Sequence, residues 1–321
     1  MSILIVGAGP SGAYLAQLLA NKGLLVTLLD RLKNPTDNCF SSAVVPITSI
    51  TSNLIPYESI STFWKNWQIY DPNGNKHIWR ASENLGAVLD FGKFREHLWN
   101  KAKKDGVELL NGWNVKSVFQ HNDYVLIELI DPNGNITRRK FDFVVDASGH
   151  SRRILRLINH QSSNNNDLLC KGNGIEWILQ ANECSSKDWL DRVVFFIGSK
   201  WIKHGYGWIF PMKHNKLKVG VCRLPPPGFE INSDVSDLNA LKKILSKAHL
   251  EDLEVIQRHG GVLSSTIKRK EQHVIGRIIG VGDAVSTANL LGGEGIRHAM
   301  LSAEILAPLL IDSSNSLSTN K

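Results

Sequence analysis

The first thirty residues constrain the fold of this chain more than any other stretch. An apolar run at 3–6 enters Gly7-Ala8-Gly9-Pro10-Ser11-Gly12, and a second apolar run ends at Asp30. Short apolar runs bounded by turn residues predict buried strands, and the stretch between them has the length of a helix. We therefore expect a strand, a glycine turn, a helix and a second strand, the first unit of a doubly wound α/β sheet.

The glycine turn has the spacing of a phosphate-binding loop. Gly7 permits the tight turn, Gly9 lets the backbone approach a pyrophosphate, and Gly12 lets the helix approach the strand. The first N–H groups and the dipole of the helix favour an anion at this point. Asp30 stands eighteen residues past Gly12, where an acid can bind ribose hydroxyls. The residues predicted to bind a dinucleotide here are Gly7, Gly9, Pro10, Ser11, Gly12, Asp30 and Arg31.

A second segment of this kind lies far along the chain. Residues 278–284 predict a buried strand ending in Gly282-Asp283, and a glycine-rich stretch at 290–296 precedes an apolar helix from about Arg297 to Leu310. An acid at the carboxyl end of a strand and a glycine-rich helix start can hold a polar, phosphate-bearing ligand. Two such places in one chain suit a long cofactor.

Together these two segments resemble the FAD-binding fingerprint shared by aromatic hydroxylases, flavin halogenases and geranylgeranyl reductases. The resemblance implies an FAD cofactor, with the acid of the Gly-Asp pair near the ribityl and pyrophosphate region and the next glycine loop beside the isoalloxazine ring. Carried over, these roles fall on Gly282, Asp283, Gly292, Gly293, Gly295 and Ile296.

A third segment, at 141–153, is similar to another stretch of these flavoproteins, which usually reads Asp-Gly-x-x-Ser-x-x-Arg. Here the order is Asp146, Gly149, Ser151 and then Arg152 or Arg153, so it departs from that pattern. The resemblance places Asp146 and Gly149 at the cofactor. It also places a polar residue near the start of the predicted helix at 89–104, where Lys93 is the candidate and a solvent-facing lysine is the alternative.

Composition predicts a water-soluble enzyme of two domains. The 321 residues are 42% hydrophobic, enough for a sizeable core, and they contain no run of eighteen apolar residues and no leader pattern. We therefore expect a cytoplasmic protein. Cys39, Cys170, Cys184 and Cys222 form no C-x-x-C pair, so we expect no metal site. Cys39 is a candidate substrate contact by resemblance, and a buried small side chain is the alternative.

The net charge of +7 comes from scattered basic clusters. These are most simply solvated turns, and no nucleic-acid-binding module is visible. A basic surface also suits a nicotinamide cofactor or, if the substrate is a lipid, contact with the periphery of a membrane. Oligomeric state is left open.

Two near-identical turns, 71–75 and 131–135, lie between strand-like runs and predict hairpins, because each contains Asn-Gly. Strands are also predicted at 192–197, 207–211 and 217–224, and a loop at 159–168. The resulting fold class is α/β, with a Rossmann-like FAD-binding domain interleaved with a smaller β-sheet substrate domain. The predicted FAD-binding domain comprises 1–45, 85–158 and 272–311, the substrate domain 46–84 and 159–271, and a disordered tail 312–321.

An aromatic strand distinguishes among the related families. Gly205-Tyr206-Gly207-Trp208-Ile209-Phe210-Pro211 is similar to the Tyr-x-Trp-x-Phe-Pro signature of geranylgeranyl reductases. Tyr206, Trp208 and Phe210 alternate, so they share one face of a strand, where they can line an apolar cavity or pack in a core. Halogenases carry a related Trp-x-Trp-x-Ile-Pro version, but this chain lacks its first tryptophan and an obvious catalytic lysine.

The resemblance thus implies an FAD-dependent enzyme that uses NADPH or NADH to reduce double bonds in an apolar, prenyl substrate. A monooxygenase or halogenase, a carotenoid-cyclase-like flavoprotein and a protein with structural FAD are the alternatives. No catalytic residue stands out. Geranylgeranyl reductases generally continue well beyond the Gly-Asp helix, whereas this sequence ends about ten residues after it, so a more open cavity or a different substrate is the alternative.

Overall fold

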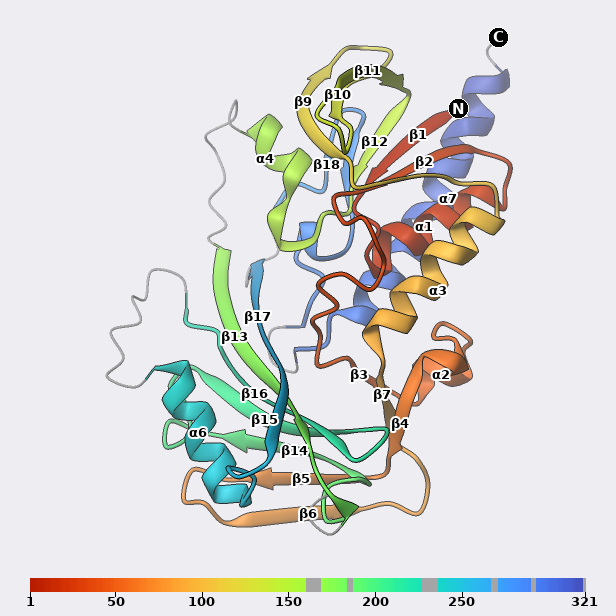
Figure 1. Ribbon diagram of the computed structural model, residues 1–321. Helices are drawn as coiled ribbons and strands as arrows, with labels where there is room; N and C mark the ends of the chain where they lie inside the picture. Colours follow the sequence, from red (N-terminus) through yellow and green to blue (C-terminus); the bar gives the residue numbers. More distant parts are fainter. Residues whose placement is uncertain (160–168, 184–186, 227–235, 267–270, 290–292, 320–321) are drawn as a thin grey trace. The chain divides into compact units, whose positions relative to one another are not determined.

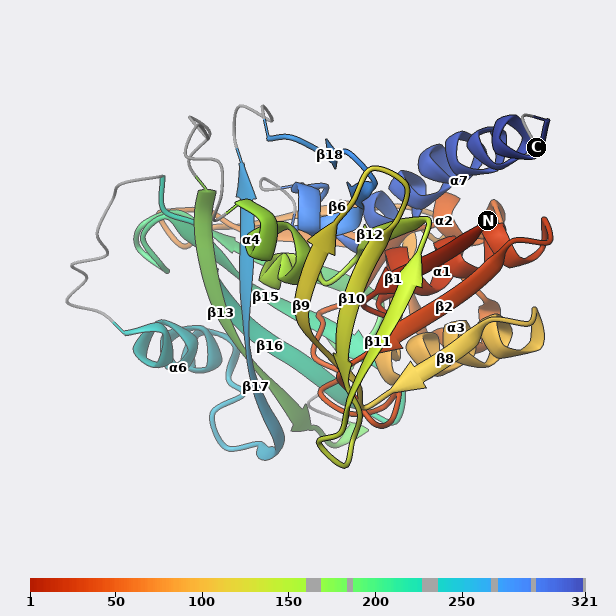
Figure 2. The same cartoon turned by 90° about the horizontal axis from the view of Figure 1, so that it is seen from above.

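The computed structural model describes residues 1–159, 169–183, 187–226, 236–266, 271–289 and 293–319. The chain forms two compact units, and each is assembled from segments that are distant in sequence. Unit 1 comprises Met1–Cys39, Gly92–Leu168 and Ser265–Lys321, and unit 2 comprises Phe40–Phe91 and Leu169–Ser264. Figures 1 and 2 show the elements of both.

Unit 1 is built on a six-stranded sheet in the order β18-β19-β12-β1-β2-β8. The central strand β1 pairs in parallel with both β2 and β12, and only the short β18 is antiparallel. Strands buried on both faces need continuous apolar residues, which explains the runs seen in the sequence. The strands are β1 (Ser2–Val6), β2 (Leu25–Asp30), β8 (Glu108–Asn111), β12 (Phe143–Asp146), β18 (Val274–Ile275) and β19 (Ile278–Gly280).

A three-stranded antiparallel meander covers one face of this sheet. Its strands are β9 (Asn114–Gln120), β10 (Val125–Ile130) and β11 (Ile136–Phe141). Leu4 and Val6 of β1 lie in one buried cluster with Val125 and Ile127 of β10. The short helix α4 (Arg153–Asn159) borders the same cluster, to which it contributes Ile154 and Leu155.

Three longer helices complete unit 1, namely α1 (Pro10–Ala20), α3 (Phe91–Lys104) and α7 (Ile296–Thr319). Helix α1 lies along α7, where Tyr14 Oη donates to Glu304 Oε1 at 2.8 Å. It also contacts α3, because Gln17 Nε2 donates to the carbonyl oxygen of Leu98 at 3.0 Å. These contacts hold α1 between the two other helices (Figure 1).

Helix α7 extends through residues 312–319, where composition predicts a disordered tail. The structure thus assigns helix to positions where composition predicts disorder, and disorder of the tail stays a prediction. Serine and asparagine cost a helix only about 0.5 kcal/mol each relative to alanine, so a helix already formed by the apolar residues before them can continue.

Unit 2 is built on a seven-stranded sheet in the order β17-β13-β16-β15-β14-β5-β6. All its described pairings are antiparallel except β14 with β5. The strands are β5 (Asn66–Tyr70), β6 (Lys76–Arg80), β13 (Leu169–Gln180), β14 (Arg192–Ile197), β15 (Gly205–Met212), β16 (Lys216–Arg223) and β17 (Glu254–Thr266).

Helix α6 (Asp237–Ala248) covers one face of that sheet and buries Leu241 and Ile244 in an apolar cluster of unit 2. Its start is capped by Ser236, whose hydroxyl accepts a bond from the N–H of Asn239 at 3.2 Å. On the other face lies a small sheet in the order β3 (Val44–Pro46), β7 (Gly86–Leu89) and β4 (Ile60–Trp64). The single-turn helix α2 (Thr48–Thr51) lies between β3 and β4 in the chain. Trp64 of β4 packs with Trp208 and Phe210 of β15.

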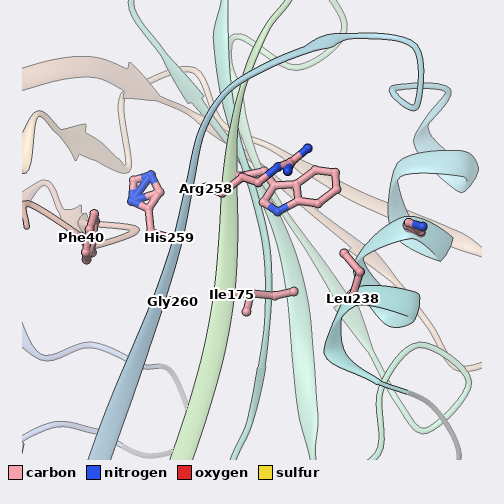
Figure 3. A pocket seen from close by; sticks show the side chains of 8 residues that line it. Phe40, Ile175, Leu238, Arg258, His259 and Gly260 are labelled. Atoms are coloured by element: carbon pink, nitrogen blue, oxygen red, sulfur yellow. The ribbon is translucent and has the colours of Figure 1, made fainter.

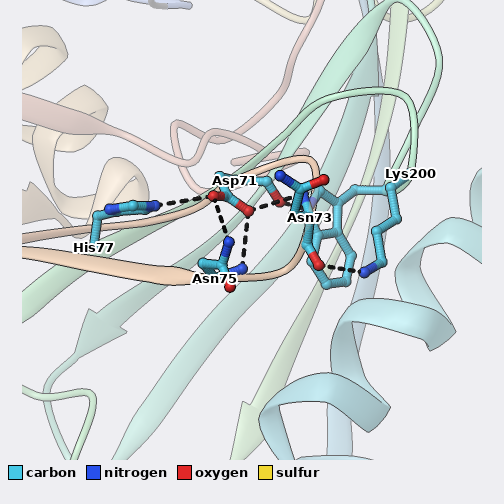
Figure 4. A network of polar contacts seen from close by, with 6 residues as sticks. Asp71, Asn73, Asn75, His77 and Lys200 are labelled. Atoms are coloured by element: carbon cyan, nitrogen blue, oxygen red, sulfur yellow. Dashed lines mark hydrogen bonds and ion pairs between the residues drawn. The ribbon is translucent and has the colours of Figure 1, made fainter.

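Both predicted hairpins are confirmed, as β5–β6 and β10–β11. In the first, Asp71 Oδ1 accepts the N–H groups of Asn73 and Asn75 at 2.8 and 2.9 Å, and Oδ2 accepts from Asn75 Nδ2 and His77 Nε2 (Figure 4). The bond from His77 is the main reason that the pKa of Asp71 lies well below its ordinary value. Lys200 Nζ then donates to the carbonyl oxygen of Asn73 at 2.7 Å, which ties the turn to the loop after β14.

The fold class predicted from the sequence, a Rossmann-like α/β unit interleaved with a β-sheet unit, is confirmed. The strands expected at 192–197, 207–211 and 217–224 correspond to β14, β15 and β16. The loop expected at 159–168 lies, except for Asn159, outside the described residues.

Candidate cofactor site

The glycines of the first turn are required by close backbone contacts. Gly7 has φ of +108°, and a Cβ built on it would lie 2.3 Å from the carbonyl oxygen of Ala147. A Cβ on Gly12 would lie 1.9 Å from the carbonyl oxygen of Gly7. Neither position accepts a side chain, so the start of α1 packs directly against the ends of β1 and β12.

Gly9 differs, because a Cβ built on it would meet nothing within 4 Å. It is the N-cap of α1, and no side chain caps the N–H groups of the first helical turn. Pro10 follows as the first helical residue, a position where its missing N–H costs nothing. The turn therefore presents open space beside helix N–H groups that no side chain caps. A pyrophosphate needs this arrangement, so the turn fits the pyrophosphate of FAD.

Asp30 is fixed at the end of β2 by two backbone N–H groups. Its Oδ2 accepts from Ala8 at 2.7 Å and its Oδ1 from Leu32 at 2.8 Å. Each carboxylate oxygen can accept a second bond, so the group retains capacity for a ribose hydroxyl. Arg31 follows it. Burial is the main reason that the pKa of His150 is lowered, and the charges of Arg156 and Arg31 lower it further, so Arg31 lies near that imidazole.

Helix α3 directs Arg95 toward this region, and a cofactor contact by Lys93 stays a prediction. Arg95 is buried, its guanidinium donates to the carbonyl oxygens of Pro35 and Asp37, and its charge attracts Asp30. Lys93 is exposed. The sequence indicates that Arg95 lies on the buried face of this helix, because positions 95, 98, 99 and 102 have helical spacing and the last three are apolar.

Asp146 has a structural task. Its carboxylate is fully buried and accepts the N–H groups of Ser148, Ile154 and Leu155 at 3.0, 2.8 and 2.9 Å. It thereby holds the turn after β12 and the first turn of α4. Gly149 in this turn has φ of +66° and open space beside it, and cofactor contact by Asp146 and Gly149 stays a prediction.

The two ends of the predicted site meet at Gly282 and Ser11. Gly282 has φ of +65°, and a Cβ on it would lie 2.4 Å from Ser11 Oγ. The next residue, Asp283, is partly buried, and its pKa is raised by desolvation. A Cβ on Gly295 would lie 3.7 Å from Asp283 Oδ2, so the start of α7 also reaches this point.

Residues from 7–12, 282–283 and 293–296 therefore come together in unit 1, as the sequence predicts. Gly293 has φ of +66°, and Ile296 is the first residue of α7. Gly292 lies outside the described residues. No ligand contact tests these assignments, so they stay predictions.

Sequence reasoning missed a buried group that links two of these loops. Arg152 has a left-handed backbone with φ of +48°, forms an ion pair with Glu271, and donates to Ser286 Oγ at 2.7 Å. Ser286 also accepts the N–H of Thr266 at 3.0 Å. Because Ser286 closes the turn that begins at Gly282, Arg152 holds that turn to the end of the 146–152 loop.

In unit 2, Tyr206, Trp208 and Phe210 share the face of the sheet opposite α6. Trp208 and Phe210 are buried in a cluster with Trp64, so within this unit they serve as packing residues. Trp208 Nε1 donates to Glu176 Oε2 at 2.8 Å. Burial raises the pKa of Glu176, and burial likewise raises the pKa of Tyr206. Substrate contact by the three aromatic residues stays a prediction.

Cys39 and Cys222 are partly buried and Cys170 is buried, and none of the three forms a disulfide; Cys184 lies outside the described ranges. Among the residues that the structure places, no three His, Cys, Asp or Glu side chains gather as a metal site would require. In the same part of the chain, none of the helices has the length and apolarity needed to span a bilayer.

Comparison with protein families finds a match to an FAD binding domain over residues 1–47. Among curated proteins, the chain is 26% identical to the digeranylgeranylglycerophospholipid reductase of Haloferax volcanii, over 95% of this chain and 74% of that protein. It is 24% identical to the geranylgeranyl diphosphate reductase of a Synechocystis species, over 98% of this chain and 76% of that protein.

Solved structures show the same fold. A geranylgeranyl bacteriochlorophyll reductase-like protein from Thermoplasma acidophilum superposes with a TM-score of 0.83 at 21% identity, covering 98% of this chain and 79% of that one. A myxobacterial chondrochloren halogenase superposes with a TM-score of 0.76 at 14% identity, covering 98% and 75%. The architecture of both units is therefore shared by flavoproteins of different activity.

Proposed function

We propose that this chain, an FAD-dependent oxidoreductase of the flavoprotein superfamily that includes geranylgeranyl reductases and aromatic hydroxylases, reduces carbon–carbon double bonds of a prenyl compound. The proposal is carried by one observation. Similarity to reductases of prenyl substrates extends over at least 95% of the chain, through unit 2 as well as through the FAD-binding turn.

The residues proposed to hold FAD lie in unit 1. The N–H groups after Gly9 bind the pyrophosphate, Asp30 binds the ribose, and the 282–283 turn with Gly295 binds the ribityl end. Bound there, FAD supplies two-electron hydride chemistry. The protein binds and orients the cofactor and excludes water, and NADPH or NADH is the proposed source of electrons.

The proposed substrate residues lie in unit 2. Tyr206, Trp208 and Phe210 present a row of rings on one sheet face, and an apolar face of this kind suits a prenyl chain. Cys39, the last residue of the first segment of unit 1, is a further proposed contact. An isolated alkene has no carbonyl group to polarise, so no acid–base triad is required of the site.

The test is an anaerobic flavin oxidation assay. The purified, FAD-loaded protein is reduced without oxygen, geranylgeranyl diphosphate is added, and the visible flavin absorbance is followed. We expect the absorbance to return, and we expect no return with phytanyl diphosphate, the matched control that lacks double bonds. Comparison of NADPH with NADH as reductant then identifies the electron donor.

Two other results would refute the proposal. Absorbance that returns only when oxygen is admitted, with oxygen incorporated into product, identifies a monooxygenase or halogenase. A rearranged product that forms without net consumption of NAD(P)H identifies a cyclase-like reaction.

A further inference from the structure

An open cavity of about 630 Å³ lies entirely within unit 2, where β13, β17 and α6 meet (Figure 3). This volume falls within the range of small-molecule sites. The cavity is lined by Phe40, Ile175, Trp177, Leu238, Lys242, Arg258, His259 and Gly260. None of these residues belongs to the proposed FAD site or to the aromatic row of β15.

The walls of the cavity are apolar for a reason that follows from strand and helix periodicity. Ile175 and Trp177 are two residues apart on β13, so both point to the face covered by α6, and both border its buried cluster. Leu238 lies on the neighbouring helix, is 41% exposed, and points toward Ile175 across the cavity (Figure 3). An exposed leucine facing two half-buried side chains leaves apolar surface for a ligand to cover.

Two cations border this apolar surface. Lys242 is four residues after Leu238 and therefore lies on the same side of α6. Arg258 has its guanidinium carbon 4.9 Å from the centroid of the Trp177 ring, which fixes the charge above the apolar wall. No acid lines the cavity, and neither cation forms an ion pair with a residue that the structure places.

The edge strand β17 adds room and a polar group. Gly260 lines the cavity, and a Cβ built on it would make only ordinary contacts, the nearest at 3.5 Å. His259 points to the opposite side of β17, where its ring contacts Phe40 with a centroid separation of 4.7 Å (Figure 3). Both ring nitrogens of His259 are shielded from solvent and bond to nothing in the described part of the chain.

We propose that this cavity binds the phosphate end of a prenyl phosphate, with Lys242 and Arg258 on the phosphate oxygens and the first isoprene units against Trp177, Ile175 and Leu238. The inference rests on the proposed function for its choice of ligand and goes beyond it, because the cavity lies on the sheet face covered by α6, opposite the row of Tyr206, Trp208 and Phe210, and is thus a separate site for the same class of compound. An apolar wall bordered by two unpaired cations is complementary to a ligand that is apolar along its length and anionic at one end.

Titration calorimetry tests the site without catalysis. The probes are farnesyl diphosphate, inorganic pyrophosphate and farnesol, added to the FAD-loaded protein. We expect farnesyl diphosphate to bind more tightly than either fragment, because it alone uses both the apolar wall and the cations. A hydrogen bond to a charged group contributes about 1.5–3 kcal/mol, so Lys242→Gln and Arg258→Gln should each weaken binding by roughly tenfold or more.

Two further variants separate the site from general effects. Lys247→Gln removes a charge from the same helix outside the cavity, over the ring of Tyr70, and should leave affinity unchanged. Gly260→Val places a side chain in the cavity at a position whose backbone accepts a Cβ, so it should weaken binding while the melting temperature is maintained.

Several outcomes overturn the proposal. Equal affinities in wild type, Lys242→Gln and Arg258→Gln exclude the cavity as the phosphate site, as does absence of farnesyl diphosphate binding. Binding only to phosphatidylglycerol vesicles, weakened by the same two variants, identifies the patch as a membrane contact instead. If the variants lose binding but bound prenyl diphosphate does not reoxidise the reduced flavin, the site stands and the proposed reductase function fails.

Discussion

Replacing Arg152 by Met should destabilise unit 1 strongly, because it leaves a buried carboxylate without its partner. The Arg152 and Glu271 side chains are 9% and 4% exposed. Removing one partner of a buried ion pair costs about 3–5 kcal/mol. Met at this position adopts the same left-handed backbone as Arg152, with φ of +48°, so the backbone strain is the same in both proteins. The difference in stability between wild type and variant therefore reports the lost ion pair.

The size of the effect can be read from thermal unfolding. A unit of this size changes its melting temperature by about 2–4 °C per kcal/mol, which gives a fall of roughly 6–20 °C for Arg152→Met. Ser286 Oγ keeps the N–H of Thr266 as a partner in the variant, so little further loss is expected there.

The matched double variant, Arg152→Met with Glu271→Leu, decides whether the charge is the cause. Arg152 Nε and Glu271 Oε1 have no hydrogen-bond partner in the described part of the chain, so the pair is incompletely satisfied. Replacing both members of such a pair by apolar side chains is often neutral or stabilising. We expect the double variant to melt within a few degrees of wild type. A double variant as unstable as Arg152→Met would refute the reasoning.

Two other predictions concern the glycine turn and acid stability. Gly9→Ala adds a methyl group in open space, so we expect a melting temperature near that of wild type but weaker FAD binding, measured by flavin fluorescence. Gly12→Ala should instead lower the melting temperature, because its Cβ would lie 1.9 Å from a carbonyl oxygen. Equal effects of the two variants on the melting temperature would contradict this reasoning. Arg139 and Thr27 bond to Glu108 and hold its pKa below its ordinary value of 4.5, so its contribution to stability is present above that pH and is lost as the pH falls through the lowered folded value. When the pH is lowered from 7 to 3, the melting temperature of Glu108→Gln should therefore fall by less than that of wild type. Equal falls in the two proteins would exclude a role for this carboxylate in acid stability.

Local patterns were sufficient for much of this fold. The strand–glycine–helix unit at 2–20 and the hairpins at Asp71 and Asp131 are each specified by residues within a few positions of one another. Such features can be predicted because backbone preference and hydrophobic alternation act locally.

The remaining features depend on contacts between distant segments. Arg152 and Glu271 are 119 positions apart, and nothing near either residue indicates the other. The ring of Trp208 reaches Glu176 only because Gly220 lies between them on β16, where a Cβ would be 2.2 Å from that ring. The second contact follows from strand register, and neither register nor loop packing of this kind can be inferred from local patterns in one sequence.

The meeting of Gly282 with Ser11 has a consequence for biosynthesis. The glycine turn emerges from the ribosome first, but its partner loop follows only after both segments of unit 2 have been made. The central strand β1 likewise waits for β12 and then β19 to extend the sheet beside it. With FAD held by both loops as proposed, we expect cofactor capture to be a late event in the maturation of this protein. We expect a nascent chain truncated before residue 278 to carry an intact glycine motif and still fail to retain FAD.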